Sequence, residues 1–169
     1  MPVRRESGTP FSVLFLCTGN SARSILAEAA LARLGGDAFR AFSAGSQPKD
    51  APHPLAIETL ERLGYETQGL RSKSWDEFAG SESPGVDLIV TVCDNAAGES
   101  CPIWPGHPLS VHWGVPDPAA VEGALEARRA FFEAIHDRLA AMIAALVRID
   151  PNRLDDEELG RRCEEIGRR

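Results

Sequence analysis

The sequence predicts an α/β fold, a four-stranded parallel sheet flanked by helices on both faces. Short apolar runs rich in strand-forming residues alternate along the chain with stretches whose apolar residues recur at helical spacing. The runs at 11–16 and 86–92 are largely apolar, which is typical of strands buried on both faces of a parallel sheet. The connections are short, and no linker, repeat or low-complexity segment divides the chain.

The length and the net charge of the chain exclude some classes of function. A chain of 169 residues fits one domain, and a net charge of −7 argues against a nucleic-acid partner, which a basic patch would mark. No apolar run approaches membrane-spanning length, so we expect no membrane association and a cytoplasmic location. Residues 1–10 are polar, which predicts a flexible tail. We expect residues 11–149 to form the catalytic domain and residues 150–169 to form a charged, helical extension.

The first strand and helix enclose a short polar loop. The strand over 11–16 ends at Cys17, and apolar spacing predicts a helix from about Ala22 to Leu34, with Gly35 as its C-terminal cap. Between them lies CTGNSAR, in which a cysteine and an arginine are separated by five residues. Strand, polar loop and helix in this order are typical of an anion-binding site.

The residue types of this loop predict oxyanion and thiol chemistry. Successive backbone N–H groups over a helix N-terminus make a concave site for a tetrahedral oxyanion, and Arg23 can hold two of its oxygens. An arginine and a helix N-terminus also favour the thiolate form of a cysteine, so we expect Cys17 to be a nucleophile at neutral pH. The residues expected to bind the oxyanion beside Arg23 are Thr18, Gly19, Asn20, Ser21, Ala22 and Ser24.

The next segments continue the alternation. Residues 39–43 predict a second strand with a turn-rich loop over 44–48, and 52–63 predict a helix. His53 lies at the start of that helix, where a polar side chain more often belongs to the local structure of the helix end than contacts a substrate. Ser74 predicts the N-cap of a short helix, with Glu77 completing a capping box.

In the second half of the chain, further candidate catalytic residues follow the predicted strands. The strand over 86–92 ends at Cys93, and the small polar loop that follows closes at Cys101. A fourth strand over 109–113 leads into a turn that holds Asp117. Helical spacing then predicts a long helix over 121–149.

These side chains should meet at one edge of the sheet. In a parallel sheet the ligand site lies beyond the carboxyl ends of the strands, where Cys17, Ser43, Cys93 and Asp117 all fall. The four cysteines include no C-x2-C pair, which argues against a zinc site, and a cytosolic protein would keep them reduced. Cys163 lies among charged residues and is expected to be incidental.

Three kinds of function use these residues. A phosphatase needs Cys17 to attack phosphorus, Arg23 to stabilise the oxygens and Asp117 to protonate the leaving group. A reductase of arsenate also needs a second thiol to release arsenite and a third to accept the disulfide, which Cys93 and Cys101 can supply. A non-catalytic regulator would use Cys17 and Arg23 only to hold an anion.

Four motifs carry a family resemblance. CTGNSARS, SAGS at 43–46, VTVCDNAAGESCPIWPG and HWGVPDPA resemble the arsenate reductases with the low-molecular-weight protein tyrosine phosphatase fold, in the branch re-reduced by thioredoxin. The resemblance covers about 12–147. It implies Cys17 as nucleophile, Asp117 as acid, and a disulfide passed from Cys17 to Cys93 and Cys101. Arg23, Asn20 and Ser24 would order the oxyanion.

The resemblance also bears on cofactors and reductants. It implies no bound cofactor, an external thiol reductant (thioredoxin, or glutathione with glutaredoxin), and a possible K⁺ site at Asn20, Glu28, Ser43 and Asp76. The spacing of Cys93 and Cys101 is one residue wider than in the better-known thioredoxin-linked members. Ala119 stands after Asp-Pro, where phosphatases of this fold have an aromatic residue, which weakens the phosphatase interpretation.

Overall fold

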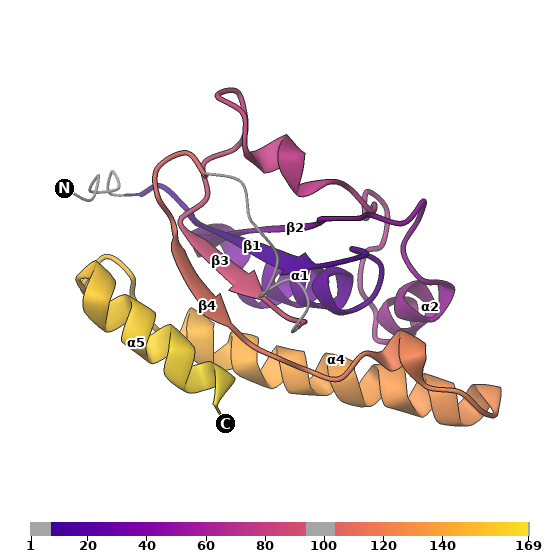
Figure 1. Ribbon diagram of the computed structural model, residues 1–169. Coiled ribbons are helices and arrows are strands. Elements are labelled where there is room, and N and C mark those ends of the chain that lie inside the picture. Colours follow the sequence, from indigo (N-terminus) through magenta and orange to yellow (C-terminus); the bar gives the residue numbers. More distant parts are fainter. Residues whose placement is uncertain (1–7, 94–103, 169) are drawn as a thin grey trace.

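The protein folds around four parallel strands in the order β2-β1-β3-β4. A computed structural model describes residues 8–93 and 104–168. The strands are β1 Phe11–Cys17, β2 Phe39–Gly45, β3 Leu88–Thr91 and β4 Leu109–His112. The predicted four-stranded parallel α/β sheet is confirmed (Figure 1).

The strand order brings the carboxyl ends of β1 and its neighbours together. Cys17 at the end of β1 lies in register with Gly45 on β2, and Leu16 lies beside Thr91 at the end of β3. The chain leaves β1 toward β2 on one side and returns as β3 on the other, which makes the end of β1 the topological switch point of the sheet. The loop after Cys17 therefore begins where ligands bind in this class of fold.

Four α-helices contribute to the larger hydrophobic core on one face of the sheet (Figure 1). They are α1 Arg23–Leu34, α2 Pro54–Arg62, α4 Leu125–Val147 and α5 Asp156–Gly167. Phe11, Val13 and Phe15 of β1 face this core, since alternate residues of a strand share a face.

The opposite face of the sheet has a smaller cover. Leu14, Leu16 and Ile89 pack there against the 3₁₀ helix η2, Trp75–Phe78, and against Trp104. Helical structure thus lies on both faces, as predicted, and within the described ranges the second face carries the single short turn η2.

Two local predictions differ from the structure. The long helix begins at Leu125 rather than Val121, because Gly123 has a φ of +119°, which no helical residue adopts, and Pro118–Ala120 form a separate 3₁₀ turn, η3. Ser74 does cap η2 through the N–H of Asp76, but the Glu77 carboxylate binds the Arg71 guanidinium, so the predicted capping box is incomplete.

The C-terminal extension forms α5 and packs on the edge strand. Cys163 and Ile166 are buried, and the indole N–H of Trp113 donates to the Cys163 carbonyl at 2.8 Å. Among the described residues, no helix is long and apolar enough to cross a membrane.

Candidate active site

The loop after β1 is held from outside through its backbone carbonyls. The four oxygens of residues 18–21 accept hydrogen bonds from the N–H groups of Gln47, Lys49 and His53 and from the hydroxyl of Ser72, at 2.6–2.9 Å. Because N–H and C=O point in opposite directions across a trans peptide, the N–H groups of residues 19–22 face the other way, into the loop. Donors turned inward are what an oxyanion requires.

The N-terminus of α1 adds to this anion site. Ala22 at the N-cap makes no side-chain hydrogen bond to the helix, and the first turn carries no acidic residue. A capping side chain or an acidic side chain at this position would compete with an external anion for the free N–H groups and for the positive end of the helix dipole. The sequence therefore leaves this helix end available to a ligand.

The thiol of Cys17 lies in a buried polar network. Its Sγ lies 2.9 Å from the hydroxyl of Ser24, and the amide of Asn20 donates to the same hydroxyl at 2.8 Å. All three side chains are buried. Since Asn20 donates to the Ser24 oxygen, the Ser24 hydroxyl is free to donate its own proton to the sulfur of Cys17.

Arg23 is oriented by the turn after β4. Its guanidinium donates to the carbonyl of Val115 at 3.1 Å and lies 3.7 Å from the carboxylate of Asp117. The other Asp117 oxygen accepts from the N–H of Ala119, which makes Asp117 the N-cap of η3. Asp117 is 40% exposed, so it can reach a substrate held by Arg23.

The second cysteine lies against the anion loop. Cys93 is buried, and its Sγ is 3.8 Å from the hydroxyl of Thr18, the residue that follows Cys17. Cys17, Cys93 and Cys163 form no disulfide with one another. Cys101, the predicted third thiol of the relay, lies outside the described residues.

Cys163 is separated from this chemistry. Burial raises the pKa of its thiol to about 11, which keeps it protonated and unreactive at neutral pH. The side chain packs within the larger hydrophobic core rather than among charged residues, and that it takes no part in the site stays a prediction.

Two of the four residues assigned to a monovalent cation, Glu28 and Ser43, contact a lysine ammonium instead. Ser43 donates to the Glu28 carboxylate at 2.6 Å, and the Lys73 ammonium lies 3.7 Å from that carboxylate and donates to the Ser43 carbonyl at 2.8 Å. The side-chain Oδ1 of Asn20 accepts from the Lys73 backbone N–H, while Asp76 is exposed on η2. Because the Lys73 ammonium already lies against Glu28 and Ser43, the four residues do not fit a bound K⁺.

Other described residues form no alternative metal centre. Within the described ranges, no group of three or more histidine, cysteine or acidic side chains is placed to hold a metal ion.

His53 supports the loop without pointing to catalysis. Its Nδ1 accepts from the N–H of Leu55, which caps α2, and its ring stacks on Phe132 with centroids 4.9 Å apart. Burial, followed by the charges of Arg128 and Lys49, lowers the pKa of its imidazole. The expectation of a local structural role agrees with these contacts.

Sequence analysis missed the residues that surround the loop. Lys73 and Ser72 lie more than 50 positions after Asn20, and their contacts with it depend on the tertiary fold. The only local signal was a lysine between two serines in a short segment with no helical or strand pattern.

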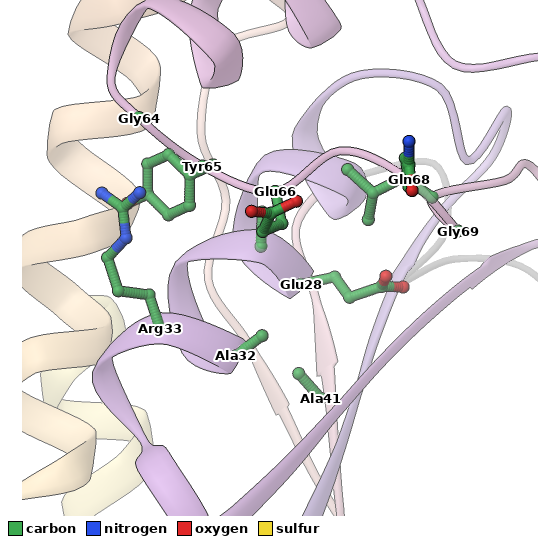
Figure 2. A pocket seen from close by; sticks show the side chains of 11 residues that line it. Glu28, Ala32, Arg33, Ala41, Gly64, Tyr65, Glu66, Gln68 and Gly69 are labelled. Atoms are coloured by element: carbon green, nitrogen blue, oxygen red, sulfur yellow. The ribbon is translucent and has the colours of Figure 1, made fainter.

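A surface pocket of about 450 Å³ adjoins the site (Figure 2). It lies between α1, β2 and the loop over 64–70; Arg33 and Tyr65 stack at one end and Glu28 lies near the other. Neither Cys17 nor Arg23 lines it, so the chemistry takes place elsewhere, but the pocket reaches the Glu28 carboxylate.

The family described as low molecular weight phosphotyrosine protein phosphatase matches residues 12–160 of the chain. Arsenate reductase from Bacillus subtilis (strain 168) is 34% identical over 127 residues, covering 75% of this chain and 88% of the relative. Arsenate reductase from Brevibacillus brevis is 35% identical over 132 residues, covering 78% of this chain and 90% of the relative.

A solved structure agrees with these relatives. The crystal structure of arsenate reductase from Archaeoglobus fulgidus DSM 4304 superposes with a TM-score of 0.58 at 27% identity, covering 78% of this chain and 98% of the other. The similarity extends over nearly the whole length of these proteins.

Proposed function

We propose that this chain, which belongs to the low molecular weight phosphotyrosine protein phosphatase family, is an arsenate reductase. The observation that carries the proposal is the second buried thiol, Cys93, whose sulfur lies 3.8 Å from the hydroxyl of Thr18 in the anion loop. A phosphatase has no use for a thiol at that position, whereas a reductase requires one. The names of the relatives support the same choice.

The first step is attack on arsenic. Arsenate binds to the inward N–H groups of the loop and to Arg23, and the Cys17 thiolate forms a bond to As(V). Asp117 gives its proton to the departing oxygen, which leaves as water. The product is a covalent thiol–arsenate adduct.

The second step is the reduction. The Cys93 thiolate attacks the Cys17 sulfur, the S–As bond breaks, and its electron pair remains on arsenic, which becomes As(III) and leaves as arsenite. Two thiolates have then lost two electrons and formed the Cys17–Cys93 disulfide. Attack by Cys101 on the Cys93 sulfur frees Cys17 and leaves a Cys93–Cys101 disulfide.

An external thiol reductant returns the enzyme to its reduced state. Thioredoxin, or glutathione with glutaredoxin, can reduce such a disulfide, and the cytoplasm, where both are found, is the proposed location. All of the proposed machinery lies in the domain over 11–149. No step uses a bound cation.

The test is arsenate-dependent oxidation of NADPH, coupled either through thioredoxin and its reductase or through glutathione, glutaredoxin and glutathione reductase. We expect the wild type to turn over and the serine variants of Cys17, Cys93 and Cys101 to be inactive. Cys163→Ala is the matched control and should keep full activity, since it removes a thiol outside the relay.

Two other results would change the assignment. Activity in Cys101→Ser would show that the reductant attacks the Cys17–Cys93 disulfide directly. Absence of arsenate reduction, together with hydrolysis of p-nitrophenyl phosphate that Cys93→Ser retains, would establish a phosphatase.

A further inference from the structure

We propose that the ammonium of Lys73 is a built-in monovalent cation that holds the anion loop in its reactive shape, so that Cys17 reactivity does not depend on free K⁺. Lys73 is a positioning residue in this account, since it acts on Cys17 only through Asn20 and Ser24. The inference rests on the proposed role of Cys17 as nucleophile.

The surroundings of the ammonium are those of a bound cation. Its Nζ donates to the carbonyls of Ser43 and Arg71, both at 2.8 Å, and lies 3.7 Å from the Glu28 carboxylate. The oxygens come from three separate segments, namely β2, the loop before η2, and α1. The ammonium thereby ties together the elements that flank the loop.

Because both partners are buried, each charge of this ion pair depends on the other for compensation. The side chains of Lys73 and Glu28 are only 10% and 16% exposed. Burial raises the pKa of Glu28 and lowers the pKa of Lys73, and in each case the opposite charge counteracts the shift. Removing either partner leaves the other charge buried and uncompensated, which is strongly destabilising.

A continuous chain of contacts leads from Lys73 to the sulfur. Its backbone N–H donates to the side-chain Oδ1 of Asn20 at 2.9 Å, the side-chain amide of Asn20 donates to Ser24 at 2.8 Å, and the Ser24 hydroxyl lies 2.9 Å from Cys17 Sγ. The Lys73 carbonyl accepts from the N–H of Gly45, so both backbone groups of Lys73 are fixed next to the loop. A displaced Lys73 would displace Asn20 and with it the Ser24 hydroxyl.

The pocket of Figure 2 gives solvent ions a route to the same place. Glu28 lines that pocket, so a free cation can reach the carboxylate if the ammonium is removed. This makes the proposal testable by substitution.

The experiment measures alkylation of Cys17 by iodoacetamide, followed by mass spectrometry of the peptide that contains it. Rates are compared at pH 6 and pH 9, in KCl and in NaCl at equal ionic strength, for the wild type, Lys73→Met and Glu28→Gln/Lys73→Met. The double variant removes both buried charges, and it keeps the test valid if Lys73→Met fails to fold. Lys49→Met is the matched control, because it removes the other lysine beside the loop, whose side chain approaches Gly19.

We expect the wild-type rate to be the same in both salts within about twofold. Loss of Lys73 should lower the rate at pH 6 by about tenfold, equivalent to about 1.4 kcal/mol, because the displaced Ser24 hydroxyl no longer contacts the sulfur. The rate at pH 9 should change much less, since an ordinary cysteine thiol is largely ionised at that pH. Lys49→Met should change the pH 6 rate by less than about twofold.

Three results would overturn the proposal: faster wild-type alkylation in KCl than in NaCl, an unchanged pH 6 rate in the double variant, or an equal loss in Lys49→Met. The last would mean that only the charge near the loop matters. None of these measurements involves arsenate, so the proposed reductase activity and the role of Lys73 can fail separately.

Discussion

At the scale of single residues, Asn20 makes several of the hydrogen bonds that hold the site together. It is buried with a φ of +45°, a conformation that asparagine tolerates better than most residues. Its side chain accepts from Lys73 and donates to Ser24, while its carbonyl accepts from Ser72. One residue thus joins the loop to the segment before η2.

We predict that Asn20→Ala lowers arsenate reduction by about 100-fold, because a misplaced nucleophile loses most of the advantage of orientation. The free energy of unfolding should fall by about 1–3 kcal/mol, because the partners of Asn20 are left buried and unpaired. Coupled NADPH oxidation and urea unfolding measure the two effects. Equal activity in Asn20→Ala and wild type would contradict the role assigned to Asn20.

A second residue-scale prediction concerns pH. Burial first, and then Arg128 and Lys49, lowers the pKa of His53 below its ordinary 6.5. The unfolded chain therefore binds more protons below about pH 6.5, so stability should fall as the pH drops through the native value and stay level above 6.5. Protonation also removes the Nδ1 acceptor that caps α2.

Urea unfolding at pH 7.5, 6.5 and 5.5 checks this prediction. His53→Asn, which can cap the helix without titrating, should reduce the loss of stability between pH 6.5 and 5.5. An identical loss in the variant would assign the acid sensitivity to other groups.

At the scale of elements, β2 and the anion loop approach so closely that only glycine fits. A Cβ on Gly45 would lie 2.4 Å from the Thr18 carbonyl oxygen and 2.8 Å from that of Cys17, and both are backbone atoms that cannot rotate away. The end of β2 therefore sets the position of the loop as directly as β1 does.

We predict that Gly45→Ala pushes the loop away from β2. Stability should fall by about 1–3 kcal/mol through overpacking, and arsenate turnover by about 100-fold through misplacement of Cys17. Gly80→Ala is the matched control, since a Cβ there meets nothing within 4 Å. Thermal unfolding and the coupled assay would contradict the prediction if the two variants behaved alike.

The sequence was most informative where the determinants are local. The strand before Cys17, the loop and α1 follow from neighbouring residues, and Cys93 follows from its place at the end of β3. The Lys73 contacts and the outward carbonyl bonds of the loop could not be predicted, because they join segments far apart in the chain. Apolar spacing places Val121 in the long helix because it carries no information on the positive φ of Gly123.

At the scale of the whole molecule, α5 completes the core. It covers β4, and Ile166 is 3% exposed in the same hydrophobic cluster as Trp113. We predict that Ile166→Ala lowers the free energy of unfolding by about 2–5 kcal/mol, as for other large core truncations. Urea unfolding followed by tryptophan fluorescence measures this loss, and exposed Glu157→Ala is the control. A loss in Ile166→Ala no larger than in the control would mean that α5 packs loosely.

The second face of the sheet carries a pair of tryptophans that contact each other. Trp75 on η2 and Trp104 stack edge to face with ring centroids 6.2 Å apart, a separation at which two indoles couple their electronic transitions. Trp104 follows Cys101 by three positions in the sequence. Because Cys101 is so near to Trp104 in the sequence, we predict that formation of a Cys93–Cys101 bond changes the near-ultraviolet circular dichroism of this pair. The protein would then report its own oxidation state optically, without an added dye or a coupling enzyme.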